Sequence, residues 1–444
     1  MHIKHLFSVL FIVLCLSGYG YTETLTIEQA LDMAYEHNRD YLKAKKDFEK
    51  SKAQIVEARA GALPVISFAG EYNRNWEPSV FVISFDGQPQ ELKIGTDNSF
   101  SAGFNLTQPI YLGGRVGTAL KIAKIYKRYS EQQLKAVYNE VRLDIYNRFY
   151  GYILAKELVR VAEQSYSLAK ANREVVENMV KQGVASEYDL LRARVAESNS
   201  LPALIQAKSG VAVSADALKS ALGMEFTDEI DPIESFQFTN LDTLVAQPVE
   251  YYQSMALERR ADLKMLDYSI QMLDKNIGLE KSAYLPSLTF STNLMWQLQR
   301  DDFDLDPDYW VRSINSAFHL QIPIFEGFGR SAKVKQARLD KQQTELSYQQ
   351  LIDGVKLEVK SAYGDLSEAI ERFNSQEETV LMAKEGLRIS ELRFKNGVGT
   401  QLEVMDARTA LTQAETNFVN AKHDVIVSLA KFEKSIGIVK PKND

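Results

Sequence analysis

The sequence predicts an α+β membrane protein in which two amphipathic β-hairpins connect very long α-helices. Four short stretches alternate strictly between apolar and polar residues, as strands with one apolar face do. Two far longer stretches contain hardly any helix breaker and place apolar residues at three- and four-residue steps, which is typical of helices. The whole order of elements then occurs a second time.

The 444-residue chain has a net charge of −7 and 25% charged residues. A surface that binds nucleic acid is basic, so nucleic acid is not expected as a partner. Residues 1–20 have the parts of a secretory signal peptide: a basic start at Lys4, a short apolar core and small residues before the cut. Removing them takes away Lys4, which changes −7 to −8, and the only cysteine, Cys15. Lipidation of Cys15 is disfavoured because Leu14, just before it, is not small.

The first copy of the pattern covers residues 21–223. A helix is predicted over 25–62, with Thr26 and Gln29 as a capping box at its start. A β-hairpin is predicted over 65–109, and its middle part, 77–97, is interpreted as a loop because it holds several prolines and glycines. A long helix over 114–181 and a last helix to about residue 222 complete this copy.

The second copy covers residues 250–437 and follows a predicted linker over 224–249. It repeats a helix over 250–284, a β-hairpin over 287–323, a long helix over 329–395 and a last helix. One constant shift in numbering maps Phe104 onto Phe318 and Gly183 onto Gly397. We therefore expect an internal duplication, followed by a short tail over 438–444.

Each hairpin passes into its long helix through a joint of proline and glycine. Proline cannot donate to a sheet ladder and suits the end of a strand, and glycine allows the turn that follows. The joint residues are Pro109, Gly113 and Gly114 in the first copy and Pro323, Gly327 and Gly329 in the second.

Four amphipathic strands are too few to close a membrane barrel, because the smallest such barrels need about eight. An open sheet edge cannot face lipid, because its backbone groups would have no partner. No stretch after the signal peptide has the roughly 18 unbroken apolar residues of a membrane helix. The chain is therefore expected to pool its strands with other copies of itself.

The segments Gln108–Arg115, Pro323–Arg330 and Gly397–Leu411 resemble the TolC-like outer-membrane efflux protein family. The resemblance extends over essentially the whole mature chain. It implies a homotrimer whose chains each give four strands to a twelve-stranded β-barrel, which continues as a long α-helical coiled-coil barrel. It also implies the outer membrane of a Gram-negative bacterium as the location, with the helices extending into the periplasm.

The resemblance implies that the chain is the exit channel of a tripartite efflux or type I secretion system. Such a channel is a passive conduit from periplasm to exterior, gated at the periplasmic helix tips, with no catalytic centre and no cofactor. The implied partners are a periplasmic adaptor (membrane fusion) protein, an inner-membrane RND, ABC or MFS transporter, and outer-membrane lipid.

The resemblance places the pore gate at Glu403 and Asp406, each of which would form a ring of three carboxylates in a trimer. Glu403 has a second interpretation, because Thr400 and Glu403 also match a capping box. Asp406 has no capping role. Gly399 stands where some members of the family carry an arginine that ties the tip closed, so that latch is not expected here.

The turns between the helices of each copy are expected to touch the adaptor, although ordinary helix capping explains the same residues. These tip residues are Gly183, Gly397, Asp189 and Thr400.

The acidic loop 301–308 is interpreted as a solvated loop, because it lacks the glycine and the terminal glutamate of a Ca²⁺-binding EF-hand. The histidines His37, His319 and His423 are isolated in the sequence, so no metal site is predicted. A periplasmic coiled-coil scaffold or adaptor without a pore is the alternative function, and it leaves the four strands unexplained. The sequence shows no nucleotide or nucleophile motif, so an enzyme is not expected.

Overall fold

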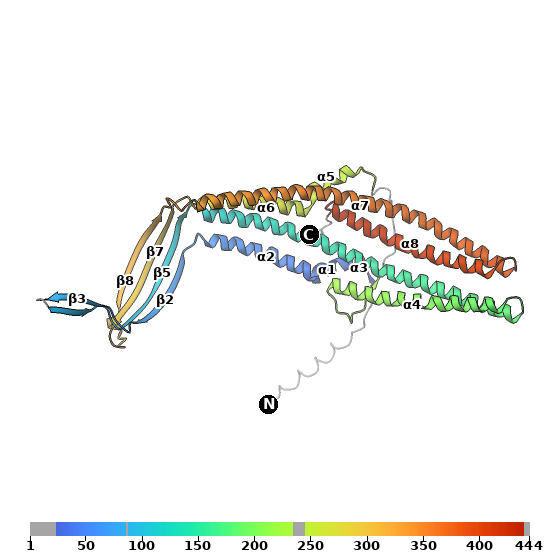
Figure 1. The fold of residues 1–444 in the computed structure, drawn as a ribbon, viewed down its shortest axis with the longest axis horizontal. Coiled ribbons are helices and arrows are strands. Elements are labelled where there is room, and N and C mark those ends of the chain that lie inside the picture. Colours follow the sequence, from blue (N-terminus) through green and yellow to red (C-terminus); the bar gives the residue numbers. More distant parts are fainter. Residues whose placement is uncertain (1–23, 86–87, 234–244, 439–444) are drawn as a thin grey trace, which may run out of the picture. The chain divides into compact units, whose positions relative to one another are not determined.

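The computed structural model describes residues 24–85, 88–233 and 245–438 (Figure 1). The predicted signal peptide, residues 234–244 of the predicted linker and the tail after Ile438 lie outside them. The chain divides into two compact units, and each is described by itself. The first holds the described residues of 1–43, 135–260 and 353–444, and the second holds those of 44–134 and 261–352. No helix in the described part of the chain has both the length and the apolar character to cross a membrane.

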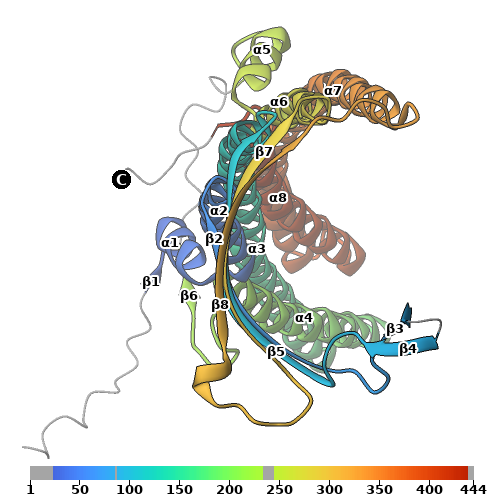
Figure 2. The same ribbon diagram turned by 90° about the vertical axis from the view of Figure 1, so that its left-hand side faces the viewer.

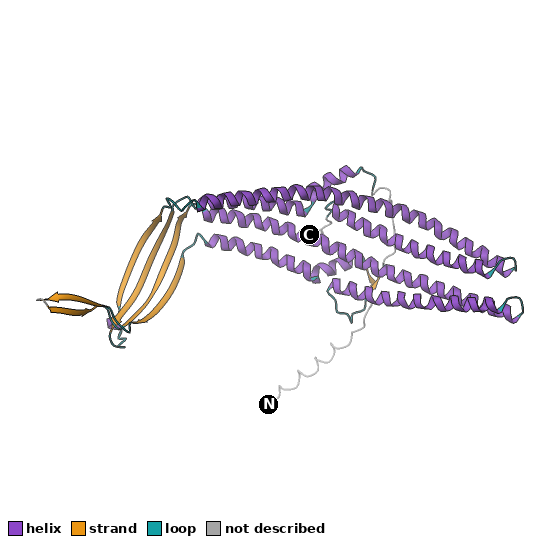
Figure 3. Cartoon of the chain, viewed as in Figure 1, coloured by secondary structure: helices purple, strands orange, loops and turns teal. Residues whose placement is uncertain are grey.

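Helices make up most of the described chain (Figure 3). They are α1 (Ile27–His37), α2 (Arg39–Ala60), α3 (Arg115–Lys181), α4 (Glu187–Leu222), α5 (Val249–Arg259), α6 (Ala261–Ser282), α7 (Gly329–Lys395) and α8 (Gln401–Ser435). The two long predicted helices are confirmed as α3 and α7, and each has 67 residues. The chain also passes through Pro202 without leaving α4.

The single helix predicted over 25–62 is wrong, because the chain breaks at Asn38 between α1 and α2. Its side-chain Oδ1 accepts the backbone N–H of Asp40 at 3.0 Å, and its Nδ2 donates to the carbonyl of Ala221 at 3.0 Å. Asn38 therefore caps α2 and anchors the break to the end of α4. The capping box of Thr26 and Gln29 at the start of α1 is confirmed.

The helix predicted over 250–284 is wrong in the same way, because Arg260 separates α5 from α6. The Arg260 guanidinium lies 2.7 Å from Glu358 of α7 and donates to the carbonyl of Ser435 at 3.1 Å. A long-range anchor thus ends each of these helices, and the local sequence pattern does not reveal it.

The second unit contains one antiparallel four-stranded sheet, in the order β2 (Val65–Arg74), β5 (Asn98–Leu112), β7 (Ser287–Arg300) and β8 (Val311–Gln321). Figure 2 shows these strands as one curved layer. The register joins the two predicted hairpins side by side, because β5 of the first pairs with β7 of the second. Both edge strands, β2 and β8, are exposed along their whole length.

The register confirms the predicted two-faced sheet. One row across all four strands is apolar and consists of Phe68, Phe104, Leu294 and Ile314. A neighbouring row on the opposite face is polar and consists of Ser67, Asn105, Asn293 and Asn315. Alternation along each strand fixes this separation, because successive side chains point to opposite faces.

The loop predicted over 77–97 is wrong, because it holds a second hairpin of β3 (Val80–Phe85) and β4 (Gln88–Lys93). The run of β-branched and aromatic residues in β3 favours a strand more than the nearby prolines and glycines oppose it. Pro89 is tolerated because β4 pairs on one side only, with β3.

The first unit has a helical core. Its fully buried side chains include Ile145 and Phe149 of α3 and Leu218 and Leu222 of α4, each 0% exposed. The short strands β1 (Thr24–Leu25) and β6 (Asp231–Pro232) pair in parallel, and Asp231 lies 2.8 Å from Lys156 of α3. β6 lies in the described part of the predicted linker, where Pro232 is buried.

Candidate functional site

Two tight turns join the helices of the first unit, one between α3 and α4 and one between α7 and α8. Gly183 and Gly397 both have φ of 74°, the left-handed conformation that glycine adopts without strain. The backbone bonds match as well: Val184 N–H donates to Met179 O at 2.9 Å, and Val398 N–H donates to Arg393 O at 3.0 Å. Both glycines therefore end their helices as predicted, and their contact with an adaptor stays a prediction.

The next helices start at Ser186 and Thr400. Asp189 accepts the Ser186 backbone N–H at 3.2 Å and the Ser186 hydroxyl at 2.6 Å, which completes a capping box. Thr400 Oγ1 accepts the backbone N–H of Glu403 at 3.3 Å. Asp189 and Thr400 are thus capping residues in this chain, and any contact with a partner would come in addition.

The two acids predicted for the gate have different surroundings. Glu403 Oε2 lies 3.4 Å from the guanidinium of Arg393, at the end of α7. Asp406 is exposed, and in the described part of the chain its side chain makes no hydrogen bond or ion pair. Arg192, its counterpart in the first copy, instead lies 5.6 Å over the ring of Tyr188. Asp406 therefore keeps a free carboxylate, whereas Glu403 is partly neutralised within its own chain.

Gly399 lies where the chain passes close to the end of α7. A Cβ atom at this position would lie 2.9 Å from Arg393 Cβ and 3.1 Å from Phe394 N. A side chain at position 399 would therefore require the end of α7 to shift. The cation at this tip is Arg393, which the sequence pattern did not single out.

The buried side of α8 carries polar residues at heptad spacing that the sequence interpretation missed: Gln401, Arg408 and Glu415. Arg408 donates to the carbonyl of Leu168 on α3 at 2.6 Å and pairs with Glu391 of α7 at 2.7 Å. The sequence does contain a signal for these buried polar residues, because they recur at the same seven-residue step as the buried Val404 and Leu411. This seam ties α8 to α3 and α7 through polar contacts.

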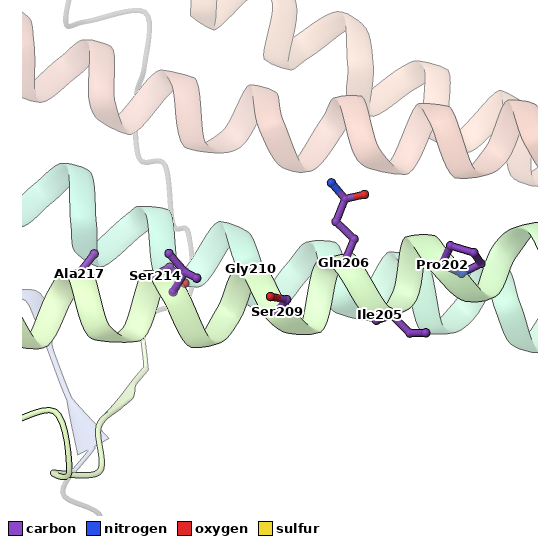
Figure 4. Close-up of a pocket in the computed structure, with 8 residues that line it drawn as sticks. Pro202, Ile205, Gln206, Ser209, Gly210, Ser214 and Ala217 are labelled. Carbon is purple, nitrogen blue, oxygen red and sulfur yellow. The ribbon is translucent and has the colours of Figure 1, made fainter.

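A shallow groove of about 690 Å³ runs along α4 beside Pro202 (Figure 4). Its lining includes the small residues Ser209 and Gly210. Ile205 and Val213, which also line it, are 61% and 67% exposed. This face of α4 is therefore apolar, hollowed and open to solvent in the single chain.

The first strand–helix joint lies in the second unit. Gly113 and Gly114 have φ of 61° and 79°. A Cβ at Gly113 would lie 2.6 Å from the carbonyl oxygen of Ser282 on α6, so this position has no room for a side chain. Pro109 does not end its strand as predicted, because β5 continues to Leu112. β2 pairs with β5 only as far as Thr107, and the pairing of β5 with β7 shifts register between Pro109 and Tyr111. The absence of a backbone N–H at Pro109 is therefore tolerated.

The second joint differs from the expected one. Gly327 has φ of 58°, but the second left-handed residue is Phe328, with φ of 66°. Gly329, predicted to make this turn, is already the first residue of α7. Pro323 follows the end of β8 as predicted, and its carbonyl accepts a bond from Arg330 at 3.4 Å. Phe328, a bulky residue, therefore holds the left-handed conformation for which the sequence suggested glycine.

The carboxylates of the loop 301–308 mainly hold its own backbone. Those of Asp302, Asp304 and Asp306 each accept the N–H two residues further on, at 3.0–3.4 Å. Asp301 pairs with Lys93 at 2.8 Å. Within residues 24–85, 88–233 and 245–438, no cluster of three or more His, Cys, Asp or Glu side chains is arranged to hold a metal ion.

Several known proteins are similar to this chain. It is 23% identical over 423 residues to the probable efflux pump outer membrane protein TtgC of Pseudomonas putida, covering 93% of this chain and 82% of that protein. It is 21% identical over 416 residues to the outer membrane protein TolC of Vibrio cholerae, covering 93% and 90%. The cobalt-zinc-cadmium resistance protein CzcC of Cupriavidus metallidurans is also 21% identical, with the same coverage.

Solved structures share the fold. A crystal structure of CusC superposes with a TM-score of 0.76 at 18% identity, covering 93% of this chain and 92% of that one. The Campylobacter jejuni CmeC outer membrane channel gives 0.75 at 20% identity, covering 93% and 85%. The sequence model of the outer membrane efflux protein family matches residues 30–224 and 253–438. The chain therefore belongs to the outer membrane efflux protein family.

Proposed function

We propose that three copies of this outer-membrane efflux protein form one exit channel, in which the four-stranded sheets close a twelve-stranded barrel. The observation that carries the proposal is the sheet itself, with an apolar face, a polar face and two open edges. β2 and β8 are exposed along their whole length, and an open edge in lipid leaves backbone groups without partners. Joining β8 of one copy to β2 of the next satisfies both edges.

The helices of the three copies then form a coiled-coil tunnel in the periplasm. The hollowed apolar face of α4 around Pro202 supports this step, because small residues let a neighbouring helix approach closely. We further propose that residues 21–223 and 250–437 are two repeats joined by the linker 224–249. The equal lengths of α3 and α7 and the two stretches matched by the family model support this duplication.

The gate of this channel lies at the helix tips. Asp406 is its central residue, because its carboxylate has no partner in the described part of the chain, and three copies give a ring of three negative charges. Such a ring favours cations and holds water in the constriction. Glu403 contributes less, because Arg393 already pairs with it.

The channel takes its cargo from other components, namely a periplasmic adaptor and an inner-membrane transporter. The turns at Gly183 and Gly397 are the contact surface for the adaptor. The relative CzcC is named for resistance to cobalt, zinc and cadmium, so metal cations are one cargo class that is compatible with this fold. The chain acts as a conduit, and no catalytic step is assigned to it.

Membrane fractionation followed by light scattering tests the assembly. We expect the protein in the outer-membrane fraction and, after extraction in detergent, a protein mass of three chains. A mass of one chain, or recovery in the soluble periplasmic fraction, would contradict the proposal.

A further inference from the structure

Two helices of the second unit begin with positive charge where the other helices begin with negative charge. The first turns of α1, α2, α4, α5, α6 and α8 each contain an acid, which stabilises the positive end of the helix dipole. The first turns of α3 and α7 contain none. α3 starts at Arg115, and α7 carries Arg330 and Lys333 near its start. These two starts add cations to ends that are already positive.

The three cations line one cavity of about 270 Å³, together with the carboxylates Glu280 and Glu326. Three positive and two negative side chains leave a net charge of +1. Arg330 is only 8% exposed, and its Nε donates to Glu326 at 2.9 Å. Its Nη2 lies 2.5 Å from the other oxygen of the same carboxylate, so Glu326 holds this guanidinium at two atoms. Arg115 and Lys333, both exposed, therefore carry the charge that is left for an additional anion.

Exposed apolar side chains directly precede, in the sequence, the residues of α7 that line this cavity. Ile324, Phe325 and Phe328 precede Arg330 and are 93%, 71% and 77% exposed. They follow directly on β8, one of the strands proposed to cross the membrane. A free phosphate ion would make no favourable contact with these side chains, whereas the acyl chains of a lipid would cover them.

We propose that this cavity binds the headgroup of a membrane phospholipid, with the phosphate at Arg115 and Lys333, beside the ion pair of Arg330 and Glu326, and a headgroup ammonium at Glu280. The opposite charges of the lining match a headgroup that carries both a phosphate and an amine. The proposal rests on the proposed function, because it requires the strand–helix joint to lie at the periplasmic surface of the outer membrane. The lipid would then fix the joint at that surface.

Binding of a short-chain lipid to the detergent-solubilised protein tests this site. Dihexanoyl phosphatidylethanolamine is titrated by calorimetry, with dihexanoylglycerol and inorganic phosphate as separate arms. The double variant Arg115→Gln/Lys333→Gln leaves the pair of Arg330 and Glu326 intact. Its matched control, Lys121→Gln/Lys335→Gln, removes one exposed cation from each of the same two helices.

We expect the double variant to bind the phospholipid about 20-fold more weakly and the control to change less than about 2-fold. Glu280→Gln should lower the preference for dihexanoyl phosphatidylethanolamine over dihexanoyl phosphatidylglycerol. Where the double variant does not assemble, Lys333→Gln alone is measured, with about a 5-fold loss expected. Equal losses in both double variants would overturn the site, and inorganic phosphate binding as tightly as the lipid would overturn the lipid as its source.

The channel recording of the unaltered protein separates the two proposals. A conducting protein whose lipid affinity does not depend on these cations contradicts the lipid site alone. Lipid binding that depends on them in a protein that forms no pore contradicts the proposed function alone.

Discussion

Arg393 lies 3.4 Å from Glu403, so a cation of the same chain already accompanies one of the two acids at the helix tip. The pair links the last turn of α7 to the first turn of α8 across the turn at Gly397. Asp406, one turn further along α8, is exposed and has no such partner in the described part of the chain. The two carboxylates are therefore unequal, although the sequence pattern presents them as a pair.

Asp406→Asn should weaken the cation preference of the channel more than Glu403→Gln does. Asp406→Asn removes a ring of three unpaired carboxylates. Glu403→Gln removes carboxylates whose charge is already partly cancelled by Arg393. We expect the ratio of cation to anion permeability to fall by a factor of about 2 to 5 for Asp406→Asn. Reversal potentials in a salt gradient measure it, and equal effects of the two substitutions would refute the ranking.

Gly399→Ala should loosen the tip between α7 and α8. The added Cβ meets Arg393 Cβ at 2.9 Å and Phe394 N at 3.1 Å, and we expect a cost of about 1–3 kcal/mol. Hydrogen exchange of the amides over 396–404 measures the loss of protection. Gly386→Ala is the matched control, because nothing lies within 4 Å of its Cβ inside α7, and it should stabilise the helix by about 0.5–1 kcal/mol. Unchanged exchange in Gly399→Ala would contradict the close contact.

Gly113→Ala should block assembly, while Gly114→Ala should be tolerated. Both glycines are left-handed, which costs alanine about 1–2 kcal/mol, but only the Gly113 Cβ meets a backbone atom, Ser282 O at 2.6 Å. Phe328 holds a left-handed conformation in the second joint, so this conformation alone does not exclude a side chain. The amount of protein assembled in the outer membrane is the readout. If Gly113→Ala assembled in the outer membrane in the same amount as the unaltered protein, the backbone around the joint would be able to move aside, which contradicts the expected rigidity.

Arg142 of α3 and Glu433 of α8 form a largely buried ion pair with an N–O distance of 2.6 Å. Arg142→Met leaves the Glu433 carboxylate without its partner, and we expect a loss of about 3 kcal/mol of stability. The double variant Arg142→Met/Glu433→Leu should recover most of this loss, because neither charge remains. Thermal unfolding of the two variants beside the unaltered protein provides the comparison. A double variant as unstable as the single one would mean that packing, not charge, determines the effect.

His423 should make the protein less stable in mild acid. Burial lowers the pKa of His423 below its ordinary value, with the nearby Asp424 opposing this effect. The unfolded chain therefore binds the proton first, and stability falls as the pH decreases from above about 6.5 towards the lower pKa of the folded protein. The difference in melting temperature between the unaltered protein and His423→Gln should shift in favour of the variant from pH 8 to pH 5. A constant difference over this range would contradict a buried neutral imidazole.

The sequence was sufficient for features that repeat locally. Alternation along each strand predicted which residues share a face, and the register bears this out for Phe68, Phe104 and Leu294. The capping signal at Thr26 was also sufficient, because a cap involves residues only three apart.

Features that depend on distant partners could not be predicted. Asn38 and Arg260 break helices because they bind Ala221 and Ser435, far away in the chain. Arg393 reaches Glu403 only through the geometry of the tip. Phe328 takes a left-handed conformation that its side chain disfavours, so a prediction from residue type placed this turn at Gly329 instead.

Single-channel recording in a planar lipid bilayer tests the central claim most directly. The purified protein, added from one side, should produce discrete and uniform conductance steps with a preference for cations, and the size of the step should change in Asp406→Asn. A preparation of folded protein that inserts without any conductance, or that yields steps indifferent to Asp406, would contradict an exit channel gated at the helix tips.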